Sequence, residues 1–164
     1  PRLKVFCTLS PIPGFAAWLN RQLKRGENEP PAAPAVERAL KAVGAELGTD
    51  VTRIASDPAD AVGQLARLKE PLTALCATYL LRGGADAKEA EPVEDPVARF
   101  HLHNGARLER INWLANASRR GLRESLGLMV NFLYEPRSIE ANHERFARGE
   151  ITASRQARSL VLHG

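Results

Sequence analysis

Aromatic residues and cysteines are scarce in this 164-residue chain, and its apolar stretches are short. Aromatic residues make up 5% of the chain and the net charge is only +4, whereas nucleic-acid binders usually show a basic stripe with base-stacking aromatics. No apolar run approaches the roughly 20 residues that a membrane-spanning helix needs. The composition therefore favours neither a nucleic-acid nor a membrane partner, and the modest positive charge suits a polyanionic small ligand.

The two cysteines, Cys7 and Cys76, lie in apolar stretches of the sequence. Such contexts are typical of buried free thiols in a reducing compartment, with a disulfide as the alternative. The first residues lack the apolar core of a signal peptide, so we expect a cytoplasmic protein. Because the chain starts at Pro1 and enters a predicted strand almost at once, we also expect it to be a fragment with further sequence upstream.

The spacing of apolar residues, glycines and prolines predicts a helix-rich α/β (α+β) chain, with residues 1–164 forming one domain or a fragment of one. In the first half we expect, in order, a strand over 4–9, a helix over 15–26, a proline-rich loop over 27–34 and a helix over 36–48. A third helix is capped by Ser56 or Asp57, with Pro58 in its first turn. Pro71 is expected to break this pattern before a fourth helix, and 82–96 reads as a polar loop.

The second half begins with the segment "FHLHNG" at 100–105. Two apolar residues alternate there with His101 and His103, which predicts a strand, and Asn104-Gly105 is a type I′ hairpin signal leading to a second strand over 107–113. The alternative places both histidines in a loop that feeds a single strand. Beyond these, Ser118 is predicted to cap a long helix that runs past residue 130, and a weaker helix is expected over 151–162.

Several polar residues have more than one interpretation. Ser10 ends the first strand just before two prolines, so it is either a turn serine or a hydroxyl displayed at a strand end, where α/β sheets place ligand sites. His101 and His103 would share one face of a strand, a spacing that a metal site can use, but no third ligand is near. A single working histidine, or a partly exposed pair, is favoured instead. The sequence contains neither a Walker loop nor a G-x-S-x-G elbow.

Three blocks, "TLSPIPGF", "FHLHNGARLERINW" and "GLMVNFLYE", give the chain a resemblance to the C-terminal catalytic part of the malonyl-CoA decarboxylase family. They occur in that order and at similar separations, and the likeness is loose across 27–95. The resemblance implies the C-terminal portion of a GNAT-type acyltransferase fold, with 27–95 as a helical insertion and loop. It also implies decarboxylation of malonyl-CoA to acetyl-CoA and carbon dioxide, in fatty acid metabolism, with no metal, no organic cofactor and a homo-oligomeric full-length protein.

Carried over residue by residue, the resemblance makes Ser10 and His101 the catalytic pair and adds Tyr134 and Asn104 as substrate-binding residues. An imidazole is suited to protonating the thioester enolate, and a neutral hydroxyl can hold the departing carboxylate. The family convention instead makes the serine a proton acceptor. For either role, the side chains of Ser10 and His101 must lie within hydrogen-bond reach or one small group apart. The first strand is therefore expected to neighbour the segment around 100–102.

Two departures from the family pattern qualify these expectations. His103 stands where the family more often has a non-basic residue, so its charge is expected to depress the pKa of His101. The family's phosphate-cradling loop lies before the first residue of this chain. Two other functions stay open: a CoA-dependent acyltransferase of the same fold, and a basic helical module that binds nucleic acid or protein.

Overall fold

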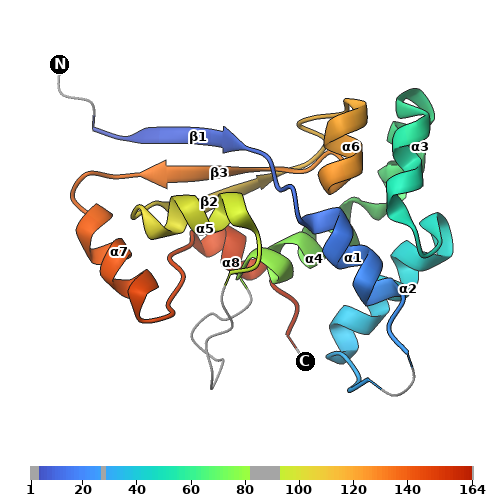
Figure 1. Cartoon of the computed structure of the whole chain (residues 1–164), viewed down its shortest axis with the longest axis horizontal. Coiled ribbons are helices and arrows are strands. Elements are labelled where there is room, and N and C mark those ends of the chain that lie inside the picture. The colour runs from blue at the N-terminus through green and yellow to red at the C-terminus, as the bar shows by residue number, and fades with distance from the viewer. Residues whose placement is uncertain (1–3, 27–28, 82–92, 164) are drawn as a thin grey trace.

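The structure, a computed structural model, describes residues 4–26, 29–81 and 93–163 of the chain. A three-stranded antiparallel sheet lies at one end of the molecule and a group of helices at the other (Figure 1). In chain order the elements are β1 (Phe6–Ser10), α1 (Phe15–Leu23), α2 (Pro34–Leu47), the 3₁₀ helix η1 (Val51–Ser56), α3 (Pro58–Leu65), the 3₁₀ helix η2 (Ala66–Leu68), α4 (Lys69–Leu81), α5 (Pro96–His103), β2 (Arg107–Asn112), α6 (Arg119–Ser125), β3 (Met129–Tyr134), α7 (Ile139–Ala147) and α8 (Arg155–Ser159). The predicted helix-rich α/β class is confirmed.

The helical end of the molecule is organised around α4. Leu72, Leu75 and Leu80 on this helix are fully buried, α2 packs along it, and α6 packs against η1. The prediction that Pro71 breaks the helical pattern is wrong. Because α4 starts at Lys69, the proline lies in the first helical turn, where a backbone N–H has no intrahelical partner to lose.

The sheet has the strand order β1-β3-β2, and β3 is antiparallel to both neighbours. Its central strand covers residues that we predicted to extend the helix capped by Ser118. That cap is present, since the Ser118 hydroxyl accepts from the Gly121 N–H, but α6 ends after Ser125. Leu126 and Gly127 both have positive φ values, 52° and 84°, which turn the chain out of the helix and into β3. Buried side chains then alternate along β3, as on a half-buried strand.

The segment predicted as the first strand of a hairpin is the helix α5. Asp95 caps its first turn through the Val97 and Ala98 N–H groups, and Pro96 occupies the first helical position. The apolar residues of α5 that belong to the core are Ala98 and Leu102, which lie one helical turn apart and are both buried. The apolar–polar alternation extends over only four residues, too few to distinguish the two-residue period of a strand from the period of a helix. Asn104-Gly105 accordingly ends the helix and does not form a hairpin turn.

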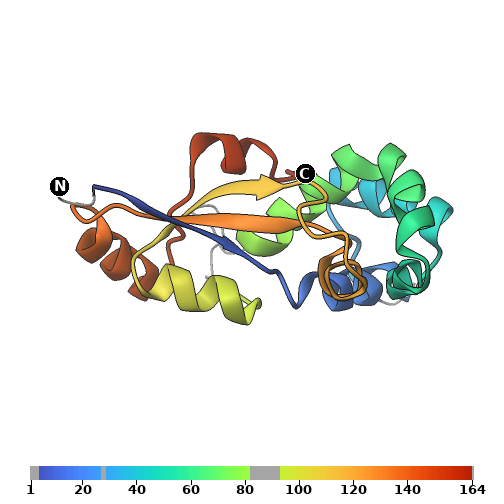
Figure 2. The same cartoon turned by 90° about the horizontal axis from the view of Figure 1, so that it is seen from above.

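The two faces of the sheet are covered by different helices. Figure 2, which looks along the sheet, shows α5 (yellow) on one side and α8 (red) on the other. The α8 side is held by backbone hydrogen bonds between Leu108 of β2 and the segment at Thr152 and Ser154, just before the helix. The α5 side receives the side chains of β1 that point inward. This face is where the predicted catalytic residues meet.

Other predictions for the second half of the chain were incomplete. No helix was predicted where α7 lies, and α8 is shorter than the predicted helix over 151–162. Cys76 is buried as expected, and both thiols are free. Cys7 is exposed, contrary to expectation, on the edge strand β1, where its side chain points to the opposite face from Thr8 and Ser10. Among the described helices, none combines the length and apolar character that crossing a bilayer would require.

Candidate active site

Ser10 closes β1 at the point where the strand gives way to the Pro11–Gly14 turn. Its side chain is only 5% exposed, so the hydroxyl is buried and is not displayed on the surface as the strand-end interpretation assumed. The Ser10 Oγ atom lies 3.1 Å from Nε2 of His101 and 2.9 Å from Oγ1 of Thr8. The expected hydrogen-bond distance between Ser10 and His101 is therefore present, although 91 residues separate them in sequence.

His101 lies in the last turn of α5, on the side of the helix that faces the sheet. Its ring stacks on Phe132 of the central strand, with centroids 4.6 Å apart and planes inclined by 22°. On the other edge of the ring, Nδ1 is 2.5 Å from the hydroxyl of Tyr134, at the end of β3. Because Phe132 is fully buried, its ring is held in place and the imidazole packs against a fixed surface.

The side chains of Thr8, Ser10, His101 and Tyr134 thus form one hydrogen-bonded series. Burial lowers the pKa of His101 and raises that of Tyr134, so at neutral pH the imidazole is uncharged and the phenol keeps its proton. A neutral imidazole has one N–H, so two proton arrangements are compatible with the geometry. Either Ser10 donates to Nε2 while Nδ1 donates to Tyr134, or Tyr134 donates to Nδ1 while Nε2 donates to Ser10.

His103 takes no part in this series. On a helix, residues two apart point in different directions, and His103 is exposed, with its ring 4.9 Å from that of His143 on α7. The shared strand face on which the paired-ligand interpretation depended does not exist. The lowered pKa of His101 also has a cause other than the one we predicted, since it comes from burial and not from the charge of His103.

Asn104 is the remaining residue proposed from the resemblance. It forms the C-cap of α5, where its backbone N–H bonds to the Phe100 carbonyl, and its side chain is exposed. Among the described residues, the hydrogen-bond partners of Ser10 and His101 do not include it. The structure therefore brings together Ser10, His101 and Tyr134, and leaves Asn104 at the edge of the group.

Two residues of the site were missed from the sequence. Thr8 precedes Ser10 by two positions, so both side chains fall on one face of β1, and this alternation was a usable signal. Phe132 was assigned to a helix, which hid its place beneath His101. Its position beneath His101 depends on the place of β3 between β1 and β2 in the sheet.

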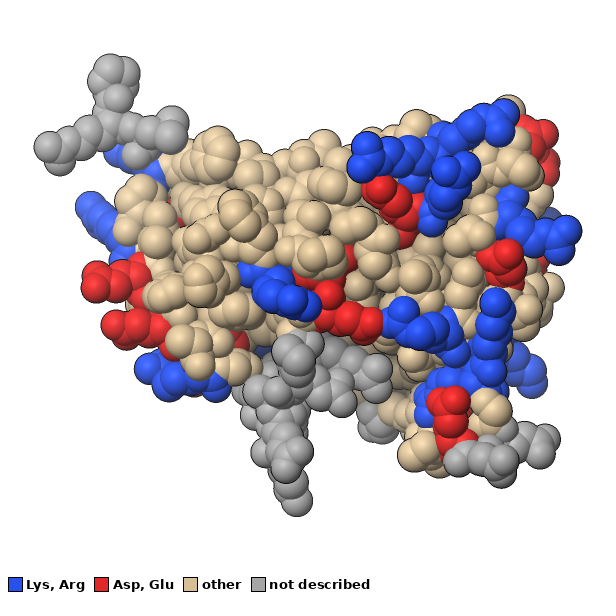
Figure 3. Space-filling view, viewed as in Figure 1, with Lys and Arg blue, Asp and Glu red and all other residues tan. Residues whose placement is uncertain are grey.

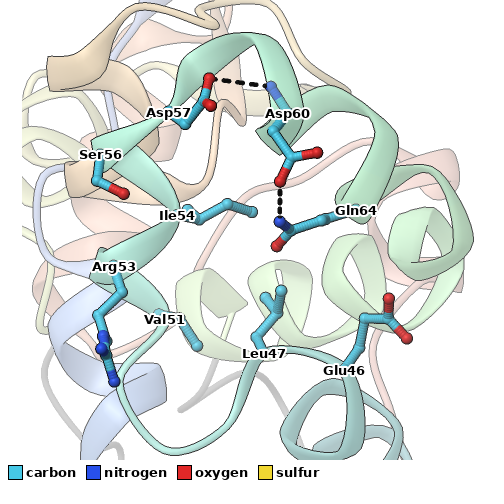
Figure 4. Close-up of a pocket in the computed structure, with 9 residues that line it drawn as sticks. All are labelled: Glu46, Leu47, Val51, Arg53, Ile54, Ser56, Asp57, Asp60 and Gln64. Atoms are coloured by element: carbon cyan, nitrogen blue, oxygen red, sulfur yellow. Dashed lines mark hydrogen bonds between the residues drawn. The ribbon is translucent and has the colours of Figure 1, made fainter.

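The molecule also has a pocket that lies away from this site. It has a volume of about 280 Å³ between the end of α2, η1 and α3, and Figure 4 shows Asp57 bonded to the Asp60 N–H and Asp60 bonded to Gln64 at its rim. Its polar side chains are exposed, and none belongs to the hydrogen-bonded series. On the face seen in Figure 3, lysines and arginines are interspersed with acidic residues and form no continuous stripe.

Comparison with known proteins identifies the family. The family model for the malonyl-CoA decarboxylase C-terminal domain matches residues 1–163. The chain belongs to the malonyl-CoA decarboxylase family. The resemblance seen in the three sequence blocks is confirmed, and the match now extends across the segment 27–95 in which the likeness was loose.

Relatives within the malonyl-CoA decarboxylase family are similar over almost the whole chain. It is 38% identical to the mitochondrial malonyl-CoA decarboxylase of Rattus norvegicus and 34% identical to that of Anser anser anser, with 98% of this chain covered in both cases. The solved structure of the enzyme from Rhodopseudomonas palustris shares 40% identity and a TM-score of 0.73 over 97% of this chain. The one from Agrobacterium vitis shares 36% identity and a TM-score of 0.71 over 98% of it.

Two further points come from these relatives. The chain spans about a third of their length: 34% and 33% of the two curated relatives, and 33% and 36% of the two solved chains. The curated malonyl-CoA decarboxylases are named as mitochondrial proteins. This contradicts the cytoplasmic location that we predicted, which rested on cysteine use and on the apparent lack of a signal peptide.

Proposed function

We propose that the protein containing this chain decarboxylates malonyl-CoA to acetyl-CoA and carbon dioxide, with Ser10 and His101 at the reacting group. The observation that carries the proposal is the hydrogen bond between the Ser10 hydroxyl and Nε2 of His101, formed in a chain of the malonyl-CoA decarboxylase family. Tyr134 supports the pair by holding Nδ1 of the same ring. The substrate is the one for which the relatives are named.

Loss of carbon dioxide breaks the bond between the carboxylate carbon and the methylene carbon of the malonyl group. The electron pair moves into the thioester, which becomes an enolate, and the methylene carbon then takes up one proton to give acetyl-CoA. The thioester carbonyl is itself the electron acceptor, so we propose a reaction that needs neither a metal nor an organic cofactor. What the site has to supply is a fixed donor for the developing oxyanion and a proton for carbon.

His101 is suited to provide that proton once substrate is bound. In the free site the imidazole is neutral, because burial lowers its pKa. A malonyl carboxylate beside it favours the charged form, since an opposite charge within about 4–6 Å raises the pKa of a histidine. The imidazole then takes a proton from solvent. After carbon dioxide has left, Nε2 passes this proton to Ser10 Oγ while the Ser10 hydroxyl proton moves to the enolate carbon, so both side chains return to their neutral forms.

The hydroxyls of Ser10 and Tyr134 accept hydrogen bonds from the protonated imidazole. In the imidazolium form, Nδ1–H donates to the Tyr134 oxygen and Nε2–H donates to Ser10 Oγ, so the Ser10 proton is free to bond to a substrate oxygen. Ser10 is uncharged, so it positions the departing carboxylate through a hydrogen bond and adds no charge of its own to the site. Asn104, at the exposed end of α5, is proposed to contact the substrate further from the reacting carbon.

The larger architecture belongs to the same proposal. We assign residues 1–164 to the C-terminal part of a GNAT-type catalytic domain, with 27–95 as a helical insertion that carries α2, α3 and α4. The phosphates of CoA are then held by residues other than those described here, and the full-length protein is expected to be a homo-oligomer that binds neither nucleic acid nor membranes.

The direct test is acetyl-CoA formation from malonyl-CoA by the protein that contains this chain. Release of carbon dioxide with a matching amount of acetyl-CoA is expected, and the same protein with Ser10→Ala and His101→Ala together is the control. Transfer of an acyl group from CoA to an amine, with no carbon dioxide released, would show an acyltransferase and refute the proposal.

A further inference from the structure

Asp95 is a buried carboxylate that bonds to three separate parts of the chain. Its side chain is 1% exposed. One oxygen, Oδ1, accepts from the N–H groups of Val97 and Ala98 at 3.1 and 3.2 Å and so caps α5. The other, Oδ2, accepts from the Gly14 N–H at 3.0 Å and from the Tyr79 hydroxyl at 3.3 Å. The two oxygens therefore face different elements.

The space around Gly14 is too small for a side chain. A Cβ atom at position 14 would lie 2.3 Å from the Tyr79 hydroxyl oxygen and 3.2 Å from Oδ2 of Asp95. The backbone at Gly14 has φ near −94°, which any residue can adopt, so it is the available space that excludes a side chain. The turn after β1 is thereby pressed onto the carboxylate.

We propose that Asp95 is a positioning residue, which sets the distance between Ser10 and His101 by tying the Gly14 turn to the start of α5. Ser10 lies four residues before Gly14 on a turn restrained by two prolines, and His101 lies six residues after Asp95 on one continuous helix. Six helical residues span about 9 Å with little freedom, so movement at the start of α5 is passed on to the imidazole. The expected effect on turnover rests on the proposed function, whereas the distance between Ser10 and His101 can be tested without it.

The chemistry of the side chain allows the two roles of Asp95 to be separated. In Asp95→Asn the remaining oxygen can still cap α5, since asparagine is as good a cap as aspartate. The amide nitrogen, however, can only donate, and it faces the Gly14 N–H, which also donates. The substitution therefore keeps the helix cap and removes the link to the turn.

Asp57 provides a matched control within the same chain. It too precedes a proline, Pro58, and caps an eight-residue helix, α3, through the Asp60 N–H, but it is exposed and lies outside the hydrogen-bonded series. Asp57→Asn thus removes the same charge from the same kind of cap.

The experiment compares Asp95→Asn and Asp57→Asn in the protein that contains this chain, by crystal structure and by malonyl-CoA turnover. In Asp95→Asn we expect the distance from Ser10 Oγ to His101 Nε2 to lengthen beyond about 3.5 Å, and kcat per folded molecule to fall roughly 10–100-fold with KM changed less than about threefold. In Asp57→Asn both quantities should stay at the wild-type values. An unchanged distance in Asp95→Asn, or an equal loss of kcat in both variants, would overturn the inference.

A second variant covers the case in which Asp95→Asn does not fold. Gly14→Ala leaves the cap intact and forces the Tyr79 hydroxyl and the turn apart, so it should lengthen the same distance and lower kcat. A folded Gly14→Ala protein with the wild-type distance would equally refute the positioning role. The crystal distance is informative without any activity: if the wild-type protein did not decarboxylate malonyl-CoA, the proposed function would fail while the role of Asp95 in the geometry could still be confirmed or rejected.

Discussion

Replacing His101 with alanine tests the proposed mechanism most directly, because His103 on the same helix is available as a control. His101 bonds to Ser10 and Tyr134 and stacks on Phe132, whereas His103 is exposed on another side of α5. The two substitutions remove the same side chain from positions two residues apart. Any difference between them must come from position and not from the loss of a histidine as such.

The expected magnitudes follow from these contacts. Loss of a positioned general acid lowers turnover by about 10²–10⁴-fold, which at about 1.36 kcal/mol per decade corresponds to about 3–5 kcal/mol of transition-state stabilisation. His101→Ala also removes a ring stack and two hydrogen bonds, at about 1 kcal/mol each, so the free energy of unfolding should fall by about 2–3 kcal/mol. His103→Ala should change turnover less than about threefold.

The assay is carbon dioxide release under saturating malonyl-CoA, corrected for the folded fraction measured by circular dichroism. This correction is needed because the stability loss alone could lower the apparent rate. If the two variants lost equal activity per folded molecule, the assignment of His101 as the proton donor would be refuted. The same conclusion would follow if His101→Ala kept normal turnover.

Two further predictions concern the same pair. Ser10→Ala should lower kcat, measured by carbon dioxide release, and reduce the free energy of unfolding by about 1 kcal/mol in a urea titration, because the hydroxyl is buried and bonds to His101; normal kcat with a large stability loss would make it a structural residue. If imidazolium is the acid, kcat/KM should fall as pH rises through the lowered pKa of free His101, and kcat should fall at a higher pH, because the substrate carboxylate raises that pKa. Rates that rise with pH over this range would instead support the serine as a proton acceptor.

Where strong local signals exist, the sequence predicted the fold well. β1 ends as expected where the prolines begin, and α2 ends at Gly48, whose φ of 73° suits glycine. Asp57 and Pro58 give α3 a well-defined start. These boundaries depend on backbone chemistry within a few residues, so no tertiary information is needed to locate them.

The errors fell where the decisive contact is distant in sequence. The residues of β3 carry an apolar pattern that suits a helix, but pairing with β1 and β2 makes them a strand. The Asn131 side chain, for example, donates to the carbonyl of Thr8, which lies 123 residues earlier. The site itself was located by resemblance to a family and not by periodicity, which gave Ser10 no more than a turn. Asp95 was assigned to the end of a polar loop, because nothing local shows that its second oxygen reaches Gly14.

Placing Ser10 on β1 has a consequence for how the site comes apart. Among the described strands β1 bonds only to β3, whereas β3 is bonded on both sides, so β1 lies at the edge of the sheet. Edge strands with exposed residues such as Phe6 and Leu9 open at a lower free energy than a central strand. Local release of β1 would carry Ser10 away while His101 and its partner on β3 stay in place. In this fold the Ser10–His101 contact can thus be lost by local opening of one edge strand, without global unfolding.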